Sequence, residues 1–148
     1  MRVALALLAD MALAHPDGKV YILGGGIDML FTPTVPFQSQ PFSLALKIEF
    51  ASVETDRPHT IEVHLLDPDG HAVMPAMKNV VVPRRHAQWP TRMSGAVMVL
   101  GFIGIQFQQY GSYAFSILVD GNEQTSLPLF IERPPACVPT IQPPALQA

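Results

Sequence analysis

The sequence predicts an all-β protein, built as an antiparallel β-sandwich of about eight strands. Two observations lead to this prediction. In several segments apolar side chains recur at every second position, which is the period of a strand with one buried face. Turn residues separate these segments at short intervals, and no stretch has the period of an amphipathic helix. The 15 prolines and 10 glycines among 148 residues agree with short strands joined by many turns.

A β-hairpin over residues 111–131 is the clearest element. Its turn is formed by Asp120, Gly121 and Asn122, residue types that tolerate the positive φ angles of tight turns. An alternating apolar series lies on each side of the turn: Tyr113, Phe115, Ile117 and Val119 before it, and Thr125, Leu127, Leu129 and Ile131 after it.

Two further strands are predicted over residues 42–50 and 60–66, followed by a turn at residues 67–70. Residues 72–82, interrupted by Pro75, are expected to form an edge strand, and residues 95–100 another strand. The expected core positions are Phe42, Leu44, Leu46, Ile48, Phe50, Ile61, Val63 and Leu65, and the expected water-facing positions are Ser43, Ala45, Lys47, Glu49, Glu62 and His64. Residues 32–41 and 83–93 are expected to be loops.

The first strand is predicted over residues 3–9, which are apolar on both faces. We expect it to pair with residues 19–23, and the glycines at 24–26 to end this hairpin with a bend. A helix over residues 3–9 is the alternative, because Ala and Leu favour helices.

The N-terminus also resembles a secretory signal, with an A-x-A cleavage site that ends at Ala14. Asp10 interrupts the apolar run, and cleavage would delete the first strand. We therefore expect the segment to be retained and the protein to be cytoplasmic, the alternative being a secreted protein without residues 1–14.

The chain is expected to form one domain over residues 1–133, followed by a flexible Pro-rich tail over residues 134–148. Its single cysteine, Cys137, lies in that tail, so no internal disulfide is possible. No apolar run approaches the ~18 residues of a membrane span.

Composition bears on the class of partner. Charged residues make up 14% of the chain, compared with about 25% in an average soluble domain. A surface so poor in charge tends to associate with other molecules. The net charge of −3 argues against a nucleic-acid partner, because phosphate contacts need a basic surface.

Three segments carry a family resemblance: VALALLAD…DGKVYILGGGID near the start, HTIEVHLLDPDG in the middle and YGSYAFSILVDGNEQTSLPLFI near the end. Together they resemble a family of small bacterial proteins of unknown function, over residues 2–131. The shared motifs are strands and turns, so the resemblance implies a fold and no activity. The closing hairpin is also similar to the closing strands of immunoglobulin-like and fibronectin-like domains, which implies an immunoglobulin-like sandwich.

No catalytic, metal or cofactor site is predicted. The five histidines (His15, His59, His64, His71 and His86) lack zinc-site spacing and are expected to be solvated. Asp28, Asp67 and Asp69 lack the further ligands of a calcium loop, and turn formation accounts for the DPDG segment. The glycines at 24–26 lack the Lys-Ser/Thr that follows in a phosphate loop.

The loop at residues 83–93 is the strongest candidate for a functional surface. It holds Arg84, Arg85, Trp89, Arg92 and Met93, residue types that anchor protein interfaces. We hypothesise that this loop binds a protein partner or mediates self-association. The alternative is a solvated loop with Trp89 packed onto the sandwich.

The sequence therefore favours a non-catalytic protein that acts through contacts, as a homo-oligomer subunit or a component of a larger assembly. The alternative is a small-ligand-binding domain or enzyme with a pocket between its sheets. In that alternative, residues 32–42 would form the lid, and Tyr21, His59 or Asp28 would supply polar contacts.

Overall fold

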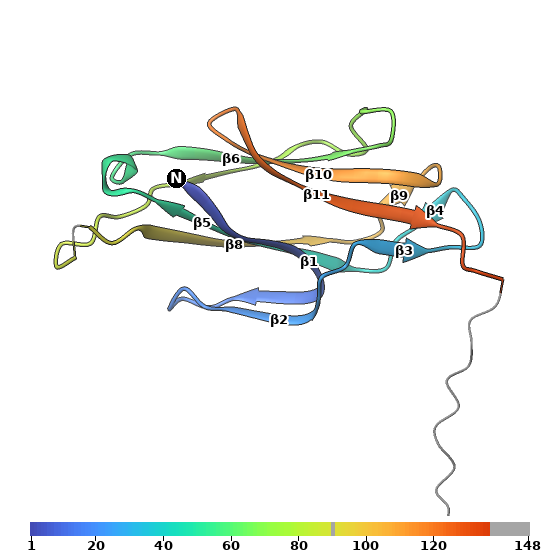
Figure 1. Cartoon of the computed structure of the whole chain (residues 1–148), viewed down its shortest axis with the longest axis horizontal. Helices are drawn as coiled ribbons and strands as arrows, with labels where there is room; N and C mark the ends of the chain where they lie inside the picture. The colour runs from blue at the N-terminus through green and yellow to red at the C-terminus, as the bar shows by residue number, and fades with distance from the viewer. Residues whose placement is uncertain (90, 137–148) are drawn as a thin grey trace, which may run out of the picture.

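The computed structural model describes residues 1–89 and 91–136, and this part of the chain is all-β apart from one short 3-10 turn (Figure 1). The described residues form 11 strands, whereas about eight were expected. β4 and β9 contain only two residues each, which is too short for a periodic pattern to reveal them. The elements are β1 (Arg2–Ala14), β2 (Val20–Gly25), β3 (Met29–Phe31), β4 (Phe37–Gln38), β5 (Phe42–Phe50), η1 (Ser52–Glu54), β6 (His59–Leu66), β7 (Met77–Val81), β8 (Ser94–Phe102), β9 (Gln106–Phe107), β10 (Gly111–Val119) and β11 (Asn122–Glu132). None of the described segments is a helix that could cross a membrane.

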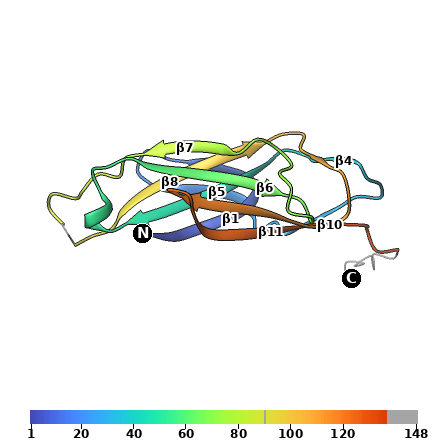
Figure 2. The ribbon, with the colours of Figure 1, turned by 90° about the horizontal axis from the view of Figure 1, so that it is seen from above.

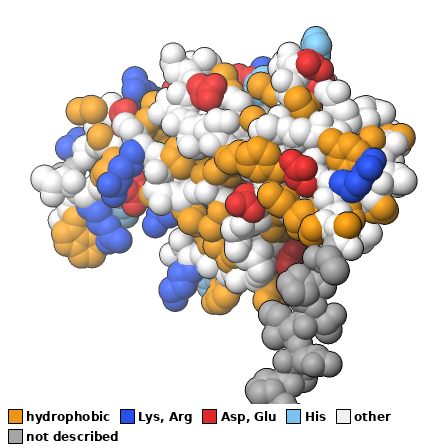
Figure 3. All heavy atoms as spheres, turned by 45° about the vertical axis from the view of Figure 1, so that its right-hand side comes forward, with side chains coloured by type: hydrophobic (Ala, Val, Ile, Leu, Met, Phe, Trp, Pro, Cys, Tyr) orange, Lys and Arg blue, Asp and Glu red, His pale blue; other side chains and the backbone are white. Residues whose placement is uncertain are grey.

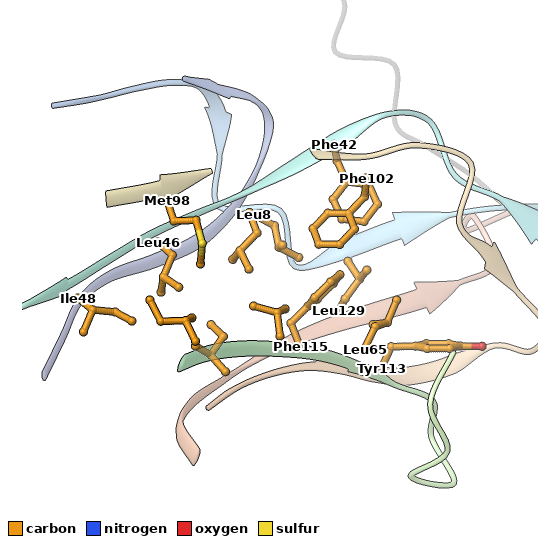
Figure 4. Close-up of a cluster of buried hydrophobic side chains, with 14 of the residues drawn as sticks. Leu8, Phe42, Leu46, Ile48, Leu65, Met98, Phe102, Tyr113, Phe115 and Leu129 are labelled. Carbon is orange, nitrogen blue, oxygen red and sulfur yellow. The ribbon is translucent and has the colours of Figure 1, made fainter. Parts of the chain in front are cut away.

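Two sheets make up the body of the molecule. The first has the strand order β2-β1-β5-β8, and the second has the order β3-β11-β10-β6-β7. β3 runs parallel to β11, and every other described pairing is antiparallel. The two sheets lie in separate layers with the apolar core between them (Figures 1 and 4).

The predicted alternation is confirmed in β5, β6 and β10. Their expected inward residues are all less than 5% exposed. The aromatic rings of Phe42, Phe102 and Phe115 meet in the core, with Phe42 and Phe102 stacked at 5.2 Å between ring centres. The hairpin turn is confirmed too, because Asp120 and Gly121 have φ angles of 51° and 79° between β10 and β11.

A hairpin does form near the start of the chain, but its predicted pairing is wrong, because residues 20–23 pair with residues 11–14 and not with residues 3–9. Arg2–Ala9 pairs with β5, whereas Ala9–Ala14 pairs with β2. The β1–β2 hairpin folds back beneath the outer face of β5 and β8 (Figure 1). This explains one wrong prediction: Ala45, expected to face water, is fully buried. Gly24 allows the bend, since its φ is +62° and a Cβ there would overlap the Asp10 carboxylate.

The predicted tail lies mostly outside the described residues, which include only residues 134–136 of it. These three residues are exposed and follow β11 without forming a strand. Residues 72–82 contain the expected edge strand, since β7 is the outermost strand of the second sheet. Residues 32–41 are a loop except for β4.

Tyr113 at the start of β10 fixes the corner that leads into the closing hairpin. Its ring is buried, and its hydroxyl donates to the carbonyl of Gln109 at 2.9 Å. The same oxygen accepts the Gln109 N–H at 3.3 Å. One hydroxyl therefore satisfies both backbone groups of a residue in the preceding turn.

Replacing Tyr113 with Phe keeps the ring and leaves those two backbone groups without their partner. We expect Tyr113→Phe to lower the free energy of unfolding by about 1–2 kcal/mol. Urea denaturation measures this change, and an unaltered m-value would show that the fold is retained. Tyr21→Phe, at a ring exposed on the β1–β2 hairpin, is the matched control and should change stability by less than about 0.5 kcal/mol. Equal effects of the two variants would contradict the assignment.

Candidate functional site

The arch between β7 and β8 carries the residues that the sequence indicated as a partner surface. It lies at one end of the sandwich (Figure 2), and its residues are described except for position 90. Arg84, Arg85, Arg92 and Met93 line one groove of about 730 Å3. Trp89 does not line it and is 56% exposed, so its ring does not pack onto the sandwich. Arg84, Arg85 and Arg92 are exposed, as in the solvated loop of the alternative.

Asp56 attaches this arch to the segment before β6. Its backbone N–H donates to the Pro83 carbonyl at 2.8 Å, and its carboxylate accepts the Arg85 N–H at 3.4 Å. The guanidinium of Arg92 lies 5.8 Å from the centre of the Trp89 ring, within the range of a cation–π contact. These contacts hold the arginine-bearing backbone beside the sheets.

Three other parts of the chain complete the groove. The outward-facing side of the first sheet contributes Arg2, Lys47, Glu49, Gly95 and Val97, and the turn of the β1–β2 hairpin contributes Asp17 and Gly18. Ala96 of β8 also lines the groove, although it pairs with Ile48 and packs against the core. A Cβ at Gly95 would come within 3.2 Å of Lys47 Cε, so glycine leaves room for that side chain. The end of β7 and the start of the arch add Val81, Val82 and Pro83.

The groove is positively charged although the chain is acidic. Five of the nine Lys and Arg residues line it, but only two of the twelve Asp and Glu residues do. Its formal charge is therefore +3, which leaves −6 for the other residues of a chain with net charge −3. Figure 3 shows Lys and Arg side chains gathered toward the end of the molecule where Figures 1 and 2 place the arch.

Both acidic residues of the groove are already paired. Glu49 accepts from the Arg2 guanidinium at 2.7 Å. Asp17 lies 2.9 Å from the Lys19 ammonium, and this bond, with the Lys19 backbone N–H, holds the pKa of Asp17 below its ordinary value. Lys47, Arg84, Arg85 and Arg92 have no carboxylate within 4.0 Å among the described residues. Guanidinium and ammonium donors without acidic partners can bind carboxylates or phosphates.

His59 contradicts the expectation that the histidines are solvated. It begins β6 with a side chain that is only 1% exposed, and it packs on Phe50 at 4.7 Å between ring centres. Nδ1 lies 2.7 Å from the Asp120 carboxylate and Nε2 lies 2.7 Å from the Glu54 carbonyl. Both partners can accept a hydrogen bond, so the ring is held in place from both of its nitrogens. No sequence pattern indicates this pair, because His59 and Asp120 lie 61 positions apart and only the pairing of β6 with β10 brings them together.

The three aspartates that were considered and rejected as calcium ligands do not form one cluster. Asp67, Asp69 and His71 place one ligand atom each within 4.8 Å of one another, whereas the carbonyl of Asp28 accepts the Phe130 N–H beside β3 and β11. Asp67 accepts the backbone N–H groups of His71 and Asp69 at 2.8 and 2.9 Å, and these bonds lower its pKa. Turn formation therefore accounts for Asp67, as the sequence indicated.

The polar contacts expected for a pocket between the sheets have separate surroundings. Tyr21 is exposed on the hairpin and lies edge-on to His15, at 6.0 Å between ring centres. His59 is paired with Asp120, and Asp28 lies beside β11. The structure does not bring these three residues together around the 32–42 segment.

One exposed surface could not be recognised from the sequence. On the β1–β2 hairpin, Met11 pairs with Leu23 and Leu13 pairs with Tyr21, so the four side chains share one face. Each is more than half exposed. The alternation of this strand pair predicts two faces, but only the folded chain reveals which of them is left uncovered.

The fold and the groove define an all-β protein with a cationic surface cleft. The chain belongs to a family of unknown function, DUF6941, whose model matches residues 4–132. This match confirms the resemblance to a family of unknown function and nearly coincides with the expected range of 2–131. No curated protein matches the chain.

The His59–Asp120 pair predicts a pH-dependent contribution to stability. The hydrogen bond from His59, with that from the Thr60 N–H, lowers the pKa of Asp120 below its ordinary value of 3.8. A carboxyl whose pKa is lower in the folded state stabilises the fold above its unfolded pKa, and this contribution is lost as the pH falls through the folded pKa.

We expect Asp120→Asn to reduce the free energy of unfolding by about 1–2 kcal/mol at pH 7, a modest loss because the carboxylate is partly exposed. Asn tolerates the positive φ of this position, so the turn itself should persist. Urea denaturation should show the difference from wild type shrinking as the pH falls below 3.8. Asp69→Asn, at an exposed turn, is the control, with an expected change below about 0.5 kcal/mol. A difference that stays constant down to about pH 2 would contradict the pairing.

Proposed function

We propose that this protein is a non-catalytic contact protein that binds a protein partner at the cationic groove. It would act as a subunit of a homo-oligomer or as a component of a larger assembly. The observation that carries the proposal is the separation of charge, +3 in the groove against −6 elsewhere. Such a separation attracts an acidic surface and orients it during association.

The composition of the groove supports a protein as the occupant. Arginines lie beside Val82, Met93 and Val97, so charged and apolar contacts are available together. Protein interfaces are enriched in Arg and Met for this reason. The exposed Trp89 stands next to Arg92 at the rim and adds a large ring to the same surface.

We also propose that the sandwich is immunoglobulin-like. The order β1-β5-β8 corresponds to strands A, B and E, and the order β11-β10-β6 corresponds to strands G, F and C. The hydrogen bond from Tyr113 to the Gln109 carbonyl has the form of the tyrosine corner at the start of strand F. The likeness concerns fold, and it adds no function by itself.

We place the protein in the cytoplasm, with residues 1–14 retained. The support is that β1 contributes Leu8 and Ala9 to the buried interior and joins β2 to β5. The mass of the chain isolated from its own cells tests this directly, because removal of residues 1–14 would indicate secretion.

The proposed function predicts that neutralising the arch weakens partner binding. The tagged chain would be isolated from its own cells with covalent cross-linking, and each recovered partner would be purified and titrated separately. Arg84→Gln/Arg85→Gln should weaken binding by about tenfold or more, since two interfacial charges are lost. Trp89→Ala/Arg85→Ala should weaken it as well.

Lys78→Gln/Arg133→Gln is the matched control, because it removes the same charge at residues that do not line the groove. It should leave affinity within about twofold of wild type. The proposal fails if the purified partner binds the groove variant and the control equally well. It also fails if the groove retains only a small anionic molecule, which would favour the small-ligand alternative.

A further inference from the structure

We infer that the partner presents an acidic segment in extended conformation, which lies along the free edge of β8 inside the groove. This inference rests on the proposed function and specifies the chemistry of its partner. Three features of the described residues support it: an unpaired strand edge, cations on both sides of that edge and apolar side chains between them.

The first feature is the edge of β8. β5 pairs with β8 along one side, and no described strand pairs with the other. Sheet edges are usually protected by charges or prolines, as β7 is by Lys78. β8, with the sequence SGAVMVLGF, has neither. Its residues 95–97 line the groove, where backbone N–H and C=O groups of an added strand could pair with them.

The second feature is the placement of the cations around this edge. Lys47 pairs with Val97 across β5 and β8, so its ammonium belongs to the sheet side of the groove. Arg84 and Arg85 come from the arch after β7, and Arg92 lies two residues before β8 begins. An extended segment in the groove would therefore meet cations from two directions. The guanidinium groups of the arginines and the ammonium group of the lysine all favour carboxylates as partners.

The third feature is the apolar lining. Val82, Met93 and Val97 share the groove with the cations. Successive side chains of a strand point to opposite faces, so a segment that alternates acidic and apolar residues presents each kind to one side. A volume of about 730 Å3 also exceeds the space that one carboxylate or phosphate group needs.

The chain's own C-terminal segment does not fit as the occupant. Residues 137–148 contain no Asp or Glu, so their side chains offer no negative charge to match the groove. An extended segment with several carboxylates must therefore come from another molecule. A nucleic acid would carry more charge, but it would also meet the −6 of the remaining surface and offers no backbone amides for a strand edge.

The test uses synthetic peptides of about ten residues, close to the nine residues of β8. The probe alternates Glu and Val, and its ends are blocked. One control replaces every Glu with Gln, and another carries N-methyl groups on alternate backbone nitrogens, which removes the donors for strand pairing. Trp89 is the only tryptophan and lies at the rim, so its fluorescence reports binding to the full chain.

We expect the Glu-Val peptide to bind the wild type and the Lys78→Gln/Arg133→Gln variant alike. Binding should be weaker by about tenfold or more for the Gln-Val peptide, for the N-methylated peptide and for Arg84→Gln/Arg85→Gln. Amide hydrogen exchange at residues 95–97 should slow in the complex, because an added strand protects the edge.

Several results would overturn the inference. Equal binding of the N-methylated peptide would mean attraction by charge without strand addition. Binding of polyphosphate or single-stranded DNA in place of the Glu-Val peptide would assign the groove to phosphates. A native mass showing a dimer that shields residues 95–97 would make a second copy the occupant. Absence of peptide binding up to about 1 mM would overturn the inference of an extended segment. The proposed function would still stand in that case if a purified partner binds Arg84→Gln/Arg85→Gln more weakly than the wild type.

Discussion

The contact between the two sheets through Phe42, Phe102 and Phe115 is the interaction on which the other features depend. Phe115 of β10 lies 5.1 Å from Phe102 and 6.1 Å from Phe42, between ring centres. These rings join the second sheet to β5 and β8 of the first. The opposite faces of β5 and β8 carry Lys47 and Gly95, so the core also fixes the position of two groove residues. Close packing of this kind transmits displacements, because interiors contain few voids that could absorb them.

The groove keeps its positive charge in an acidic protein because charges act over short distances in salt solution. At physiological ionic strength, fields from exposed groups decay over about 8 Å. Asp56 lies at the border of the groove, where it accepts the Arg85 backbone N–H, whereas acidic residues beyond this distance contribute little within the groove. The two acids that do line it are matched by Arg2 and Lys19, so their effect on the unpaired arginines is small. Net charge alone would give the opposite expectation for this surface.

The sequence predicts the strands of the core well because the period of two has one physical cause, a buried face opposite an exposed one. Phe42–Phe50 and Gly111–Val119 follow this pattern, and the structure agrees at their inward positions. Ala45 departs from it because a hairpin from a distant part of the chain covers the outer face. His59 departs because its partner, Asp120, is brought close only by the pairing of β6 with β10. The arginine loop could be recognised by residue type, but its neighbours Arg2 and Lys47 could not, since the groove that unites them is formed by sheet topology.

The β1–β2 turn at Asp17 and Gly18 reaches the same groove as residues 92–97, far along the chain. The groove is lined by four stretches that are remote from one another in sequence, at residue 2, residues 17–18, residues 47–49 and residues 81–97. All four must be in place before the cationic surface exists. A fragment cut from the arch would keep its arginines and lose the surroundings that hold them at a common site. Unfolding would disperse these positive charges among the acidic residues of the chain, so the local field belongs to the native state alone.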